Sequence, residues 1–181
     1  MHDAAGQPTD IEILARIAQG DVAAMRTLYL RHSEALQRFV ASRLRDKFEV
    51  ADVVHNTMLE VWRSAGRFEG RSNVRSWMFS IARFKTIDHI RKQSRTELAA
   101  PDEDLPDETP DAEAVIAASQ DAARVRDCVD KLAGHQRVAV HMAFFEDMTY
   151  AEIAEIEDVP QGTIKTRIFH AKKLLMRCLS G

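Results

Sequence analysis

Cysteine is scarce in this chain. Two of its 181 residues are cysteines, Cys128 and Cys178, and they do not form a CxxC motif. Small secreted domains that depend on disulfides carry many more cysteines, whereas isolated thiols are typical of a reducing cytosol. We therefore expect both cysteines to be unpaired and the protein to be cytoplasmic. The seven histidines are scattered without the spacing of a zinc site, so we expect no bound metal and no cofactor.

Long apolar runs are absent as well. No stretch approaches the roughly 18 apolar residues of a membrane-spanning helix, and the acidic N-terminus lacks the apolar core of a signal peptide. We therefore expect no membrane insertion. The sequence also lacks paired carboxylates, a nucleophile elbow and a phosphate-binding loop. Their absence argues against an enzyme and predicts no catalytic residues.

Charge is distributed unevenly along the chain. The whole sequence has a net charge of −3, which by itself does not indicate nucleic-acid binding. The segment from Arg71 to Arg95, however, contains seven basic residues and one acidic residue. The segment from Thr96 to Asp121 contains nine acidic residues and no basic one. Charge is therefore segregated along the chain, and the overall charge conceals this segregation.

The missing β pattern and the acidic segment together predict the fold class. Alternation of polar and apolar residues, typical of a half-buried strand, is absent, so the fold should be all-α. The acidic segment contains three prolines, Pro101, Pro106 and Pro110, and has too few apolar residues to offset the entropy of ordering. We predict two small helical domains, 1–95 and 118–181, joined by a flexible acidic linker over 96–117.

Local signals predict four helices in the first domain. Gly20 should end the first of them, because glycine readily takes the left-handed conformation that follows a helix. The third should run from Val50 to Phe68. Side chains that can cap a helix by accepting a backbone N–H precede the other three, namely Asp10, Asp21, and Ser72 or Asn73.

Near the C-terminus the sequence has a helix-turn-helix pattern. Thr149 and Glu152 have the spacing of a capping box, and the stretch from Glu157 to Pro160 separates the first helix from the second. The second helix has several bases and no acid after Asp158, which suits contact with DNA phosphates. A solvated basic helix at the end of a small bundle is the alternative. The residues expected to face inward are Ile164, Ile168, Ala171 and Leu175.

Aromatic residues are interleaved with bases in the middle of the chain. Trp77, Phe79 and Phe84 lie within the basic segment. Cations hold the phosphate backbone, and aromatic faces stack on unpaired bases for roughly 1–3 kcal/mol each. This combination suits strand-separated DNA. Because Trp77 and Ile81 are also at helical spacing, Trp77 could instead belong to the core.

The order of these parts resembles the extracytoplasmic-function (ECF) group of bacterial sigma factors, which carry only the second and fourth sigma domains. The resemblance covers about residues 10–95 and 118–178. It rests on an ordered set of short motifs, each weak alone. They are Gly20-Asp21, residues 52–58 with Val61-Trp62, residues 68–70, residues 76–83, residues 87–91 and the helix-turn-helix.

The resemblance implies roles for individual residues and for the linker. Docking on the polymerase β′ coiled coil would use Asp52, Val53, His55, Asn56, Leu59 and Trp62. Binding and melting of the −10 element, with a flipped base captured by the loop 68–73, would use Phe68, Gly70, Arg71, Ser72, Asn73, Arg75, Trp77, Arg83, Phe84, Lys85, Arg91 and Lys92. Reading of the −35 element would use Tyr150, Lys165, Thr166, Arg167, Phe169, His170 and Lys173. The acidic linker would pass through polymerase channels, either as a mimic of nucleic acid or as a spacer.

The function that this resemblance implies is promoter-specific initiation of transcription. The expected partners are the RNA polymerase core (β′ coiled coil and β flap), promoter DNA and an anti-sigma factor. An ordinary helix-turn-helix regulator that binds duplex DNA as a dimer would leave the docking helix and the basic-aromatic segment without a role. A mimic that sequesters an anti-sigma factor would normally carry a receiver domain, and nothing in the sequence resembles one.

Overall fold

The computed structural model describes residues 7–97 and 118–180. Over these ranges the chain forms α-helices and one short 3-10 helix, η1, and no strand, which confirms the predicted all-α fold. None of these helices is both long enough and apolar enough to cross a membrane. The predicted linker lies outside the described residues from position 98 to 117. In chain order the elements are α1 (Asp10–Ile17), α2 (Val22–Ala41), α3 (Lys47–Ser64), η1 (Ala65–Arg67), α4 (Val74–Glu97), α5 (Ala118–Asp130), α6 (Gly134–Phe144), α7 (Tyr150–Glu157) and α8 (Gln161–Ser180).

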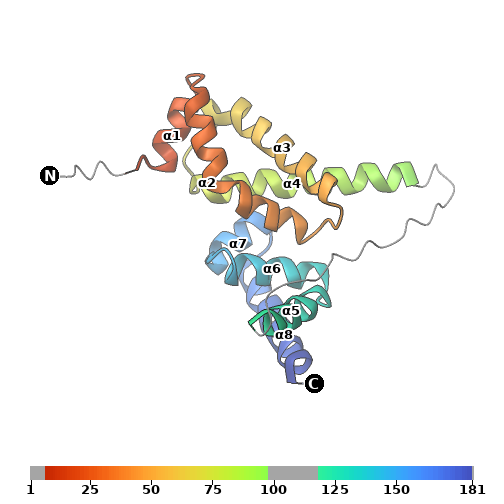
Figure 1. Cartoon of the computed structure of the whole chain (residues 1–181). Helices are drawn as coiled ribbons and strands as arrows, with labels where there is room; N and C mark the ends of the chain where they lie inside the picture. Colours follow the sequence, from red (N-terminus) through yellow and green to blue (C-terminus); the bar gives the residue numbers. More distant parts are fainter. Residues whose placement is uncertain (1–6, 98–117, 181) are drawn as a thin grey trace.

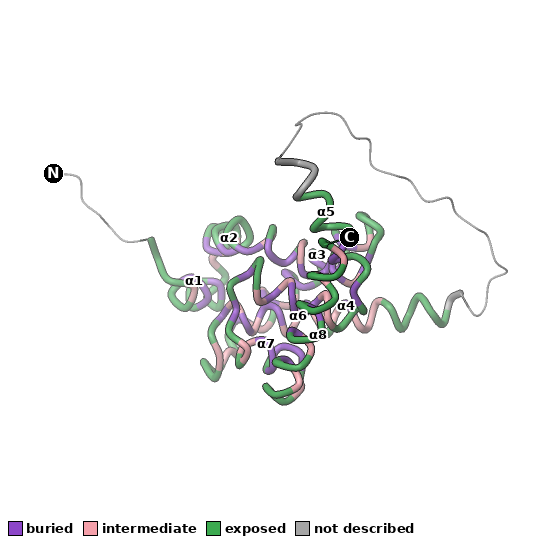
Figure 2. The backbone as a smooth tube through the Cα atoms, turned by 90° about the horizontal axis from the view of Figure 1, so that it is seen from below, coloured by how far each residue is buried: buried purple, intermediate pink, exposed green. Residues whose placement is uncertain are grey.

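The helices form two units that pack against each other (Figure 1). We call α1–α4 with η1 the N-terminal unit and α5–α8 the C-terminal unit. α7 packs on α4, and α6 packs on α2, so the two units share a junction. Figure 2 shows the buried backbone concentrated where the helices of both units meet. The apolar core is continuous across this junction, because Phe39 and Phe79 belong to the same buried cluster as Ile153.

Capping side chains set most of the helix starts. The Asp21 carboxylate accepts the backbone N–H of Ala24 at 3.0 Å, and Asn73 Oδ1 accepts that of Ser76 at 2.7 Å. Thr149 and Glu152 form the predicted capping box at the start of α7. These three predictions are therefore confirmed, and each depends on residues only three apart, which is why the sequence was sufficient.

Two predicted helix starts are wrong. Thr9 caps α1 in a capping box with Glu12, while Asp10 is the first helical residue and pairs with Arg31 and His32 of α2. The third helix begins at Lys47, because Asp46 accepts the N–H groups of the next turn, and it ends at Ser64 before η1. In both places an earlier residue supplies the cap, Thr9 for α1 and Asp46 for α3, so each helix begins before the predicted position.

The helix-turn-helix forms as the sequence predicts. Asp158 ends α7 in the left-handed conformation, with φ 54° and ψ 51°, a conformation that a short polar side chain tolerates. Ile164, Ile168 and Ala171 are buried, and Leu175 packs against a second small apolar cluster. The buried side of α8 is therefore fixed against the unit, and its opposite side is left exposed.

The prediction that both cysteines are unpaired is wrong. Cys128 on α5 and Cys178 on α8 form a disulfide, with their Cα atoms 5.8 Å apart. The two residues are 50 positions apart in the sequence, so no local spacing signals the pair. Packing of α5 on α8 brings them together, within the Cα separation that a disulfide requires.

Candidate nucleic-acid and polymerase interfaces

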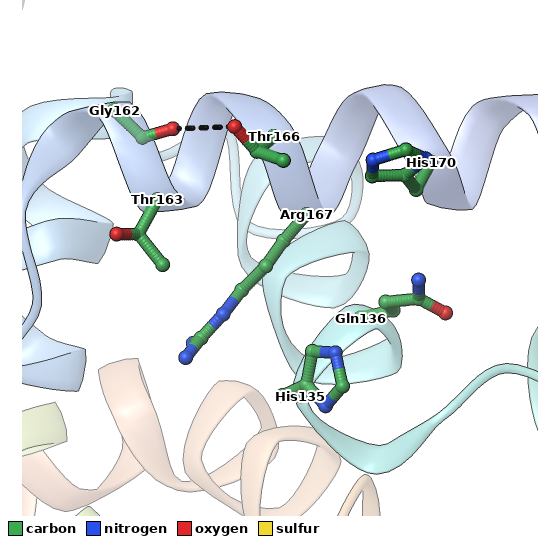
Figure 3. A pocket seen from close by; sticks show the side chains of 7 residues that line it. All are labelled: His135, Gln136, Gly162, Thr163, Thr166, Arg167 and His170. Carbon is green, nitrogen blue, oxygen red and sulfur yellow. Dashed lines mark hydrogen bonds between the residues drawn. The ribbon is translucent and has the colours of Figure 1, made fainter.

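The exposed side of α8 borders a basic groove (Figure 3). The groove has a volume of about 590 Å³ and lies between α8 and the start of α6, which contributes His135 and Gln136. A second groove of about 280 Å³ shares Gln136 and His170 with the first and continues along α8. The α8 residues that line the two grooves are Gly162, Thr163, Thr166, Arg167, His170, Lys173, Leu174 and Arg177.

Most residues predicted to face the −35 element lie on the exposed side of α8. Thr166, His170 and Lys173 line the grooves, and Lys165 and Phe169 are exposed beside them. Tyr150 lies on α7 and is partly buried. His135 and Gln136 were not among the predicted residues, because only the packing of α6 on α8 brings them to this surface.

Arg167 behaves differently from its neighbours on α8. Its side chain extends away from Thr166 and His170 in Figure 3. The guanidinium Nη1 lies 3.9 Å from an Oε2 carboxylate oxygen of Glu157, and the side chain is 21% exposed. In this arrangement Arg167 is therefore turned toward the junction between the units instead of toward solvent.

The predicted base-capturing loop encloses a small cavity. The cavity measures about 180 Å³ and is lined by residues from η1 to the start of α4. The rings of Phe68 and Trp77 are tilted at 54° with centroids 5.1 Å apart, and Gly70 has a positive φ of 69°, which glycine adopts without strain. Trp77 is partly buried, so one ring serves both as core and as cavity wall. The remaining lining residues are Arg67, Glu69, Arg71 and Ser72.

Several predicted −10 cations already have carboxylate partners on the surface of the N-terminal unit. Arg71 pairs with Glu69, Lys85 Nζ lies 3.0 Å from Glu60, and Lys92 Nζ lies 2.8 Å from Asp88. Such exposed pairs are weak and exchange easily with a phosphate. Phe84, which is 66% exposed, and Arg91 also lie on the surface of α4.

An apolar groove runs between α2 and α3. It has a volume of about 380 Å³, and Val22 and Tyr29 on its rim are 71% and 40% exposed. Predicted polymerase-docking residues contribute to its lining, and Asp52 and Asn56 lie exposed on the same helix, joined by a 3.1 Å hydrogen bond. The lining residues are Val22, Met25, Tyr29, His55, Met58, Leu59 and Trp62.

Val53 requires a correction. The resemblance placed it among the docking residues, but its side chain is 2% exposed and belongs to the main core. An apolar side chain on the inner face of α3 cannot contact a partner from there. Val53 therefore supports the docking helix from inside.

The junction between the units contains buried ion pairs around Glu146. Its side chain is 2% exposed, and its carboxylate accepts hydrogen bonds from Arg38 Nε at 2.8 Å and Arg75 Nη2 at 2.7 Å. Arg75 Nη1 also donates to the Glu146 carbonyl oxygen at 2.7 Å. Beside this pair, Asn73 Nδ2 donates to a Glu152 carboxylate oxygen at 2.7 Å. Two predicted −10 residues, Asn73 and Arg75, are thus bound to the C-terminal unit.

The junction contains a second buried carboxylate, that of Glu157. Its side chain is 9% exposed and pairs with Arg43 of the N-terminal unit. Arg83 Nε lies 3.9 Å from the same carboxylate, as does Arg167 Nη1. Sequence reasoning missed both glutamates, because their partners in the N-terminal unit are 71 to 114 positions away in the chain and no short motif links them.

Burial and pairing shift the pKa values of the junction residues. Desolvation lowers the pKa of Arg43, and attraction to Glu157 opposes this effect. The hydrogen bond to Glu146 raises the pKa of Arg38, and the backbone hydrogen bond from Thr149 lowers the pKa of Glu152. Because an arginine stays protonated in proteins, Arg38 and Arg43 are positively charged in the junction at neutral pH.

Comparison with known proteins extends over both units. The family described as Sigma-70 region 2 matches residues 28–96, and Sigma-70, region 4 matches residues 122–175. The chain is 33% identical over 152 residues to the ECF RNA polymerase sigma factor RpoE of Cereibacter sphaeroides, with 82% of each chain covered. It is 29% identical over 180 residues to the ECF RNA polymerase sigma factor SigK of Mycobacterium sp. (strain JLS), with 94% of this chain and 91% of that one covered.

A solved structure has the same fold. It is the sigma factor RpoE of Bartonella quintana, crystallised in complex with the anti-sigma factor NepR. The two folds agree with a TM-score of 0.68 at 23% identity, and the match covers 88% of this chain and 98% of that one. The likeness therefore extends over nearly the whole of that protein.

Proposed function

The chain belongs to the ECF group of RNA polymerase sigma factors within the sigma-70 family, and on this basis we propose how it selects promoters. α8 reads the −35 element, and the loop 68–73 captures an unpaired base of the −10 element. The protein has no catalytic residue of its own, since polymerase performs the chemistry, and it acts in the cytoplasm. In this proposal, residues 1–95 recognise the −10 element and residues 118–181 recognise the −35 element, and residues 96–117 link the two domains.

The observation that supports the −10 proposal is the cavity that Phe68 and Trp77 line on one side. The exposed face of this aromatic pair can stack on a flipped base, and Arg67 and Arg71, which also line the cavity, can hold the neighbouring phosphates. Unstacking a base costs a few kcal/mol, which stacking and phosphate contacts offset. Arg91, Lys92 and Phe84 extend this surface along α4.

The −35 proposal rests on the exposed side of α8. A recognition helix reads base edges from its first turns and meets phosphates further along. Lys165, Thr166 and His170 lie on the second and third turns of α8, and Lys173 lies on its fourth turn. We assign base contacts to the first group and a phosphate contact to Lys173.

Docking on the polymerase core uses the groove between α2 and α3. Its exposed apolar lining, including Tyr29, Leu59 and Trp62, is the kind of surface that a helical partner covers, and the β′ coiled coil is helical. The C-terminal unit binds the β flap. By analogy with RpoE of Bartonella quintana, which is bound by the anti-sigma factor NepR, we propose that an anti-sigma factor holds this chain inactive.

Run-off transcription with core polymerase and a promoter library tests the proposal. The chain and core together should initiate at a defined subset of templates, whereas neither should do so alone. Each unit offers DNA a small interface, and the two act together only when polymerase holds them at the correct span. Tight sequence-specific binding by the purified chain without polymerase would instead favour an ordinary helix-turn-helix regulator.

A further inference from the structure

The junction between the units has an unbalanced charge. Five guanidinium groups surround two buried carboxylates, those of Glu146 and Glu157. A buried charge is costly unless it is paired, and here the cations outnumber the anions. Both buried carboxylates come from the C-terminal unit, and Arg38 has a further, exposed partner in Glu34 of its own helix, at 2.8 Å. Four of the arginines come from two adjacent helices of the N-terminal unit, Arg38 at α2, Arg43 after α2, and Arg75 and Arg83 on α4.

In the first site, two arginines bind the Glu146 carboxylate, and each of them donates a hydrogen bond to it. Arg38 Nε and Arg75 Nη2 each approach a different carboxylate oxygen, at 2.8 and 2.7 Å. Planar guanidinium groups recognise carboxylate and phosphate with the same two-pronged geometry. The site is therefore equally suited to a phosphodiester.

The second site, around Glu157, contains more hydrogen-bond donors than its one carboxylate pairs with. Arg43 stacks on the Phe39 ring, with its guanidinium carbon 4.3 Å from the centroid, and this stacking fixes the position of its charge. Its buried Nη1 has no hydrogen-bond partner among the described residues. Arg83 and Arg167 remain 3.9 Å from Glu157, too far for a direct hydrogen bond. A single carboxylate does not satisfy the donors gathered around it.

The closed junction is incompatible with promoter recognition as proposed above. Arg75 and Asn73, assigned to the −10 element, and Arg167, assigned to the −35 element, are all engaged in this one junction. The units must therefore separate before both elements can be read. Separation removes Glu146 and Glu157 from the N-terminal unit. Arg43, Arg75 and Arg83 then lose these carboxylates, and Arg38 keeps only its surface pair with Glu34.

We propose that Arg38 with Arg75, and Arg43 with Arg83, form two binding sites for backbone phosphates of promoter DNA, which Glu146 and Glu157 occupy in the closed chain. The proposal rests on the proposed function and adds Arg38 and Arg43, on or next to α2, to the DNA-binding residues. The two glutamates act as phosphate substitutes, so the free chain covers its own DNA-binding surface. Replacement of each carboxylate by a phosphate keeps the buried arginines paired throughout.

The first experiment measures phosphate contacts in the complete holoenzyme. Core polymerase is combined with wild-type chain, Arg38→Gln, or Arg38→Gln with Arg43→Gln, and affinity for the best promoter of the library is measured over a series of salt concentrations. The slope of log affinity against log salt should become shallower by about one unit for each arginine removed. Arg26→Gln, which removes an exposed charge from the same helix α2, is the matched control and should keep the wild-type slope.

Several outcomes are decisive in this experiment. A slope for Arg38→Gln equal to that of Arg26→Gln would overturn the proposal. If the double variant does not fold, as judged by its helical circular dichroism, Arg38→Gln alone decides, because the Arg38 side chain is 40% exposed and tolerates change. If the wild-type holoenzyme does not select promoters at all, the proposed function fails. Selective initiation with unchanged slopes would reject only the phosphate sites.

The second experiment tests whether the glutamates occupy these sites. Glu146→Gln with Glu157→Gln removes both negative charges and keeps the side-chain shapes. The purified variant, without polymerase, should bind a fluorescein-labelled duplex of the same promoter about tenfold more tightly than wild type, because the competent open state is no longer a minor fraction. Its radius of gyration by X-ray scattering should also increase. Wild-type affinity together with a wild-type radius would show that the carboxylates do not mask a DNA site.

Discussion

His141, on α6, has an imidazole enclosed beside charged groups. Its Nδ1 is buried and lacks a hydrogen-bond partner among the described residues, and its ring stacks on Phe145 with centroids 4.8 Å apart. Burial lowers the pKa of His141 below the usual 6.5, with Arg38 acting in the same direction and Glu146 in the opposite one. The folded chain therefore holds this imidazole neutral.

We expect the free energy of unfolding to fall as pH drops below about 6.5. The unfolded chain binds a proton at His141 more readily than the folded chain, so acid favours unfolding until the pH passes the lowered folded-state pKa. His141→Gln should flatten this part of the profile, measured by urea unfolding at several pH values. Parallel profiles for the variant and wild type would rule out His141 as the source.

Substitutions of two lysines on α8 test the proposed roles in base reading and in phosphate binding separately. Lys165→Ala should weaken −35 recognition by roughly 1–3 kcal/mol and relax the preference at one or two base positions. Lys173→Ala, in the groove with His170 and Arg177, should reduce promoter use about equally for all −35 sequences. Both are measured by transcription from a library randomised at −35. An unchanged sequence preference for Lys165→Ala would contradict the assigned orientation of α8.

Trp77 packs against the core and also lines the cavity that we propose for −10 recognition. Trp77→Ala removes one wall of the cavity, so initiation should be impaired more on duplex promoters than on templates that are already melted. Because the ring is only partly buried, the loss in stability should be smaller than the roughly 3–5 kcal/mol of a fully buried aromatic. Paired transcription assays and thermal unfolding distinguish the two effects. An equal defect on both templates would assign Trp77 to the core alone.

At the scale of elements, the disulfide joins the first and last helices of the C-terminal unit. It closes a loop of 50 residues, and such a constraint on the unfolded chain contributes about 4 kcal/mol in the chain-entropy description. Reduction with dithiothreitol should therefore lower the midpoint of guanidinium unfolding of this unit. A variant with Cys128→Ser and Cys178→Ser should unfold early and be insensitive to the reductant. A wild-type midpoint that does not respond to reduction would contradict the stabilising role.

The sequence predicts those elements whose signals are local. The capping box at Thr149 and Glu152 and the inward stripe of α8 both depend on residues a few positions apart, and both are confirmed. The disulfide and the pairs at Glu146 depend on helix packing, and no pattern within one helix encodes them. Val53 was misassigned because a motif match gives a position but not the direction of its side chain.

At the scale of the whole molecule, the closed arrangement covers the arginines proposed to bind DNA but leaves the proposed polymerase groove open. Val22 and Tyr29 at the groove remain exposed while Arg75 and Arg83 are engaged at the junction. Under these proposals, core polymerase binds the closed chain first and opening follows, so that the proposed DNA surface stays covered until polymerase is present.

Substitutions in the groove should weaken core binding without affecting the junction. Tyr29→Ala and Leu59→Ala should each reduce affinity for core polymerase by about 1–2 kcal/mol, as expected for partly exposed apolar anchors. Leu30→Ala is the control, because Leu30 is 68% exposed on the same helix and does not line the groove. Fluorescence titration with labelled chain measures all three. A loss for Leu30→Ala as large as for Leu59→Ala would place the docking surface elsewhere.

The bridge between Cys128 and Cys178 also determines how a mechanical load would cross the C-terminal unit. The chain enters this unit at α5, and Arg124 reinforces the attachment with a 2.9 Å hydrogen bond to the carbonyl oxygen of Leu179 near the end of α8. Both bonds join the last turns of α8 to the entry helix α5. Tension applied ahead of residue 118 would therefore pass from α5 directly to the end of α8, and would not unravel its last turn.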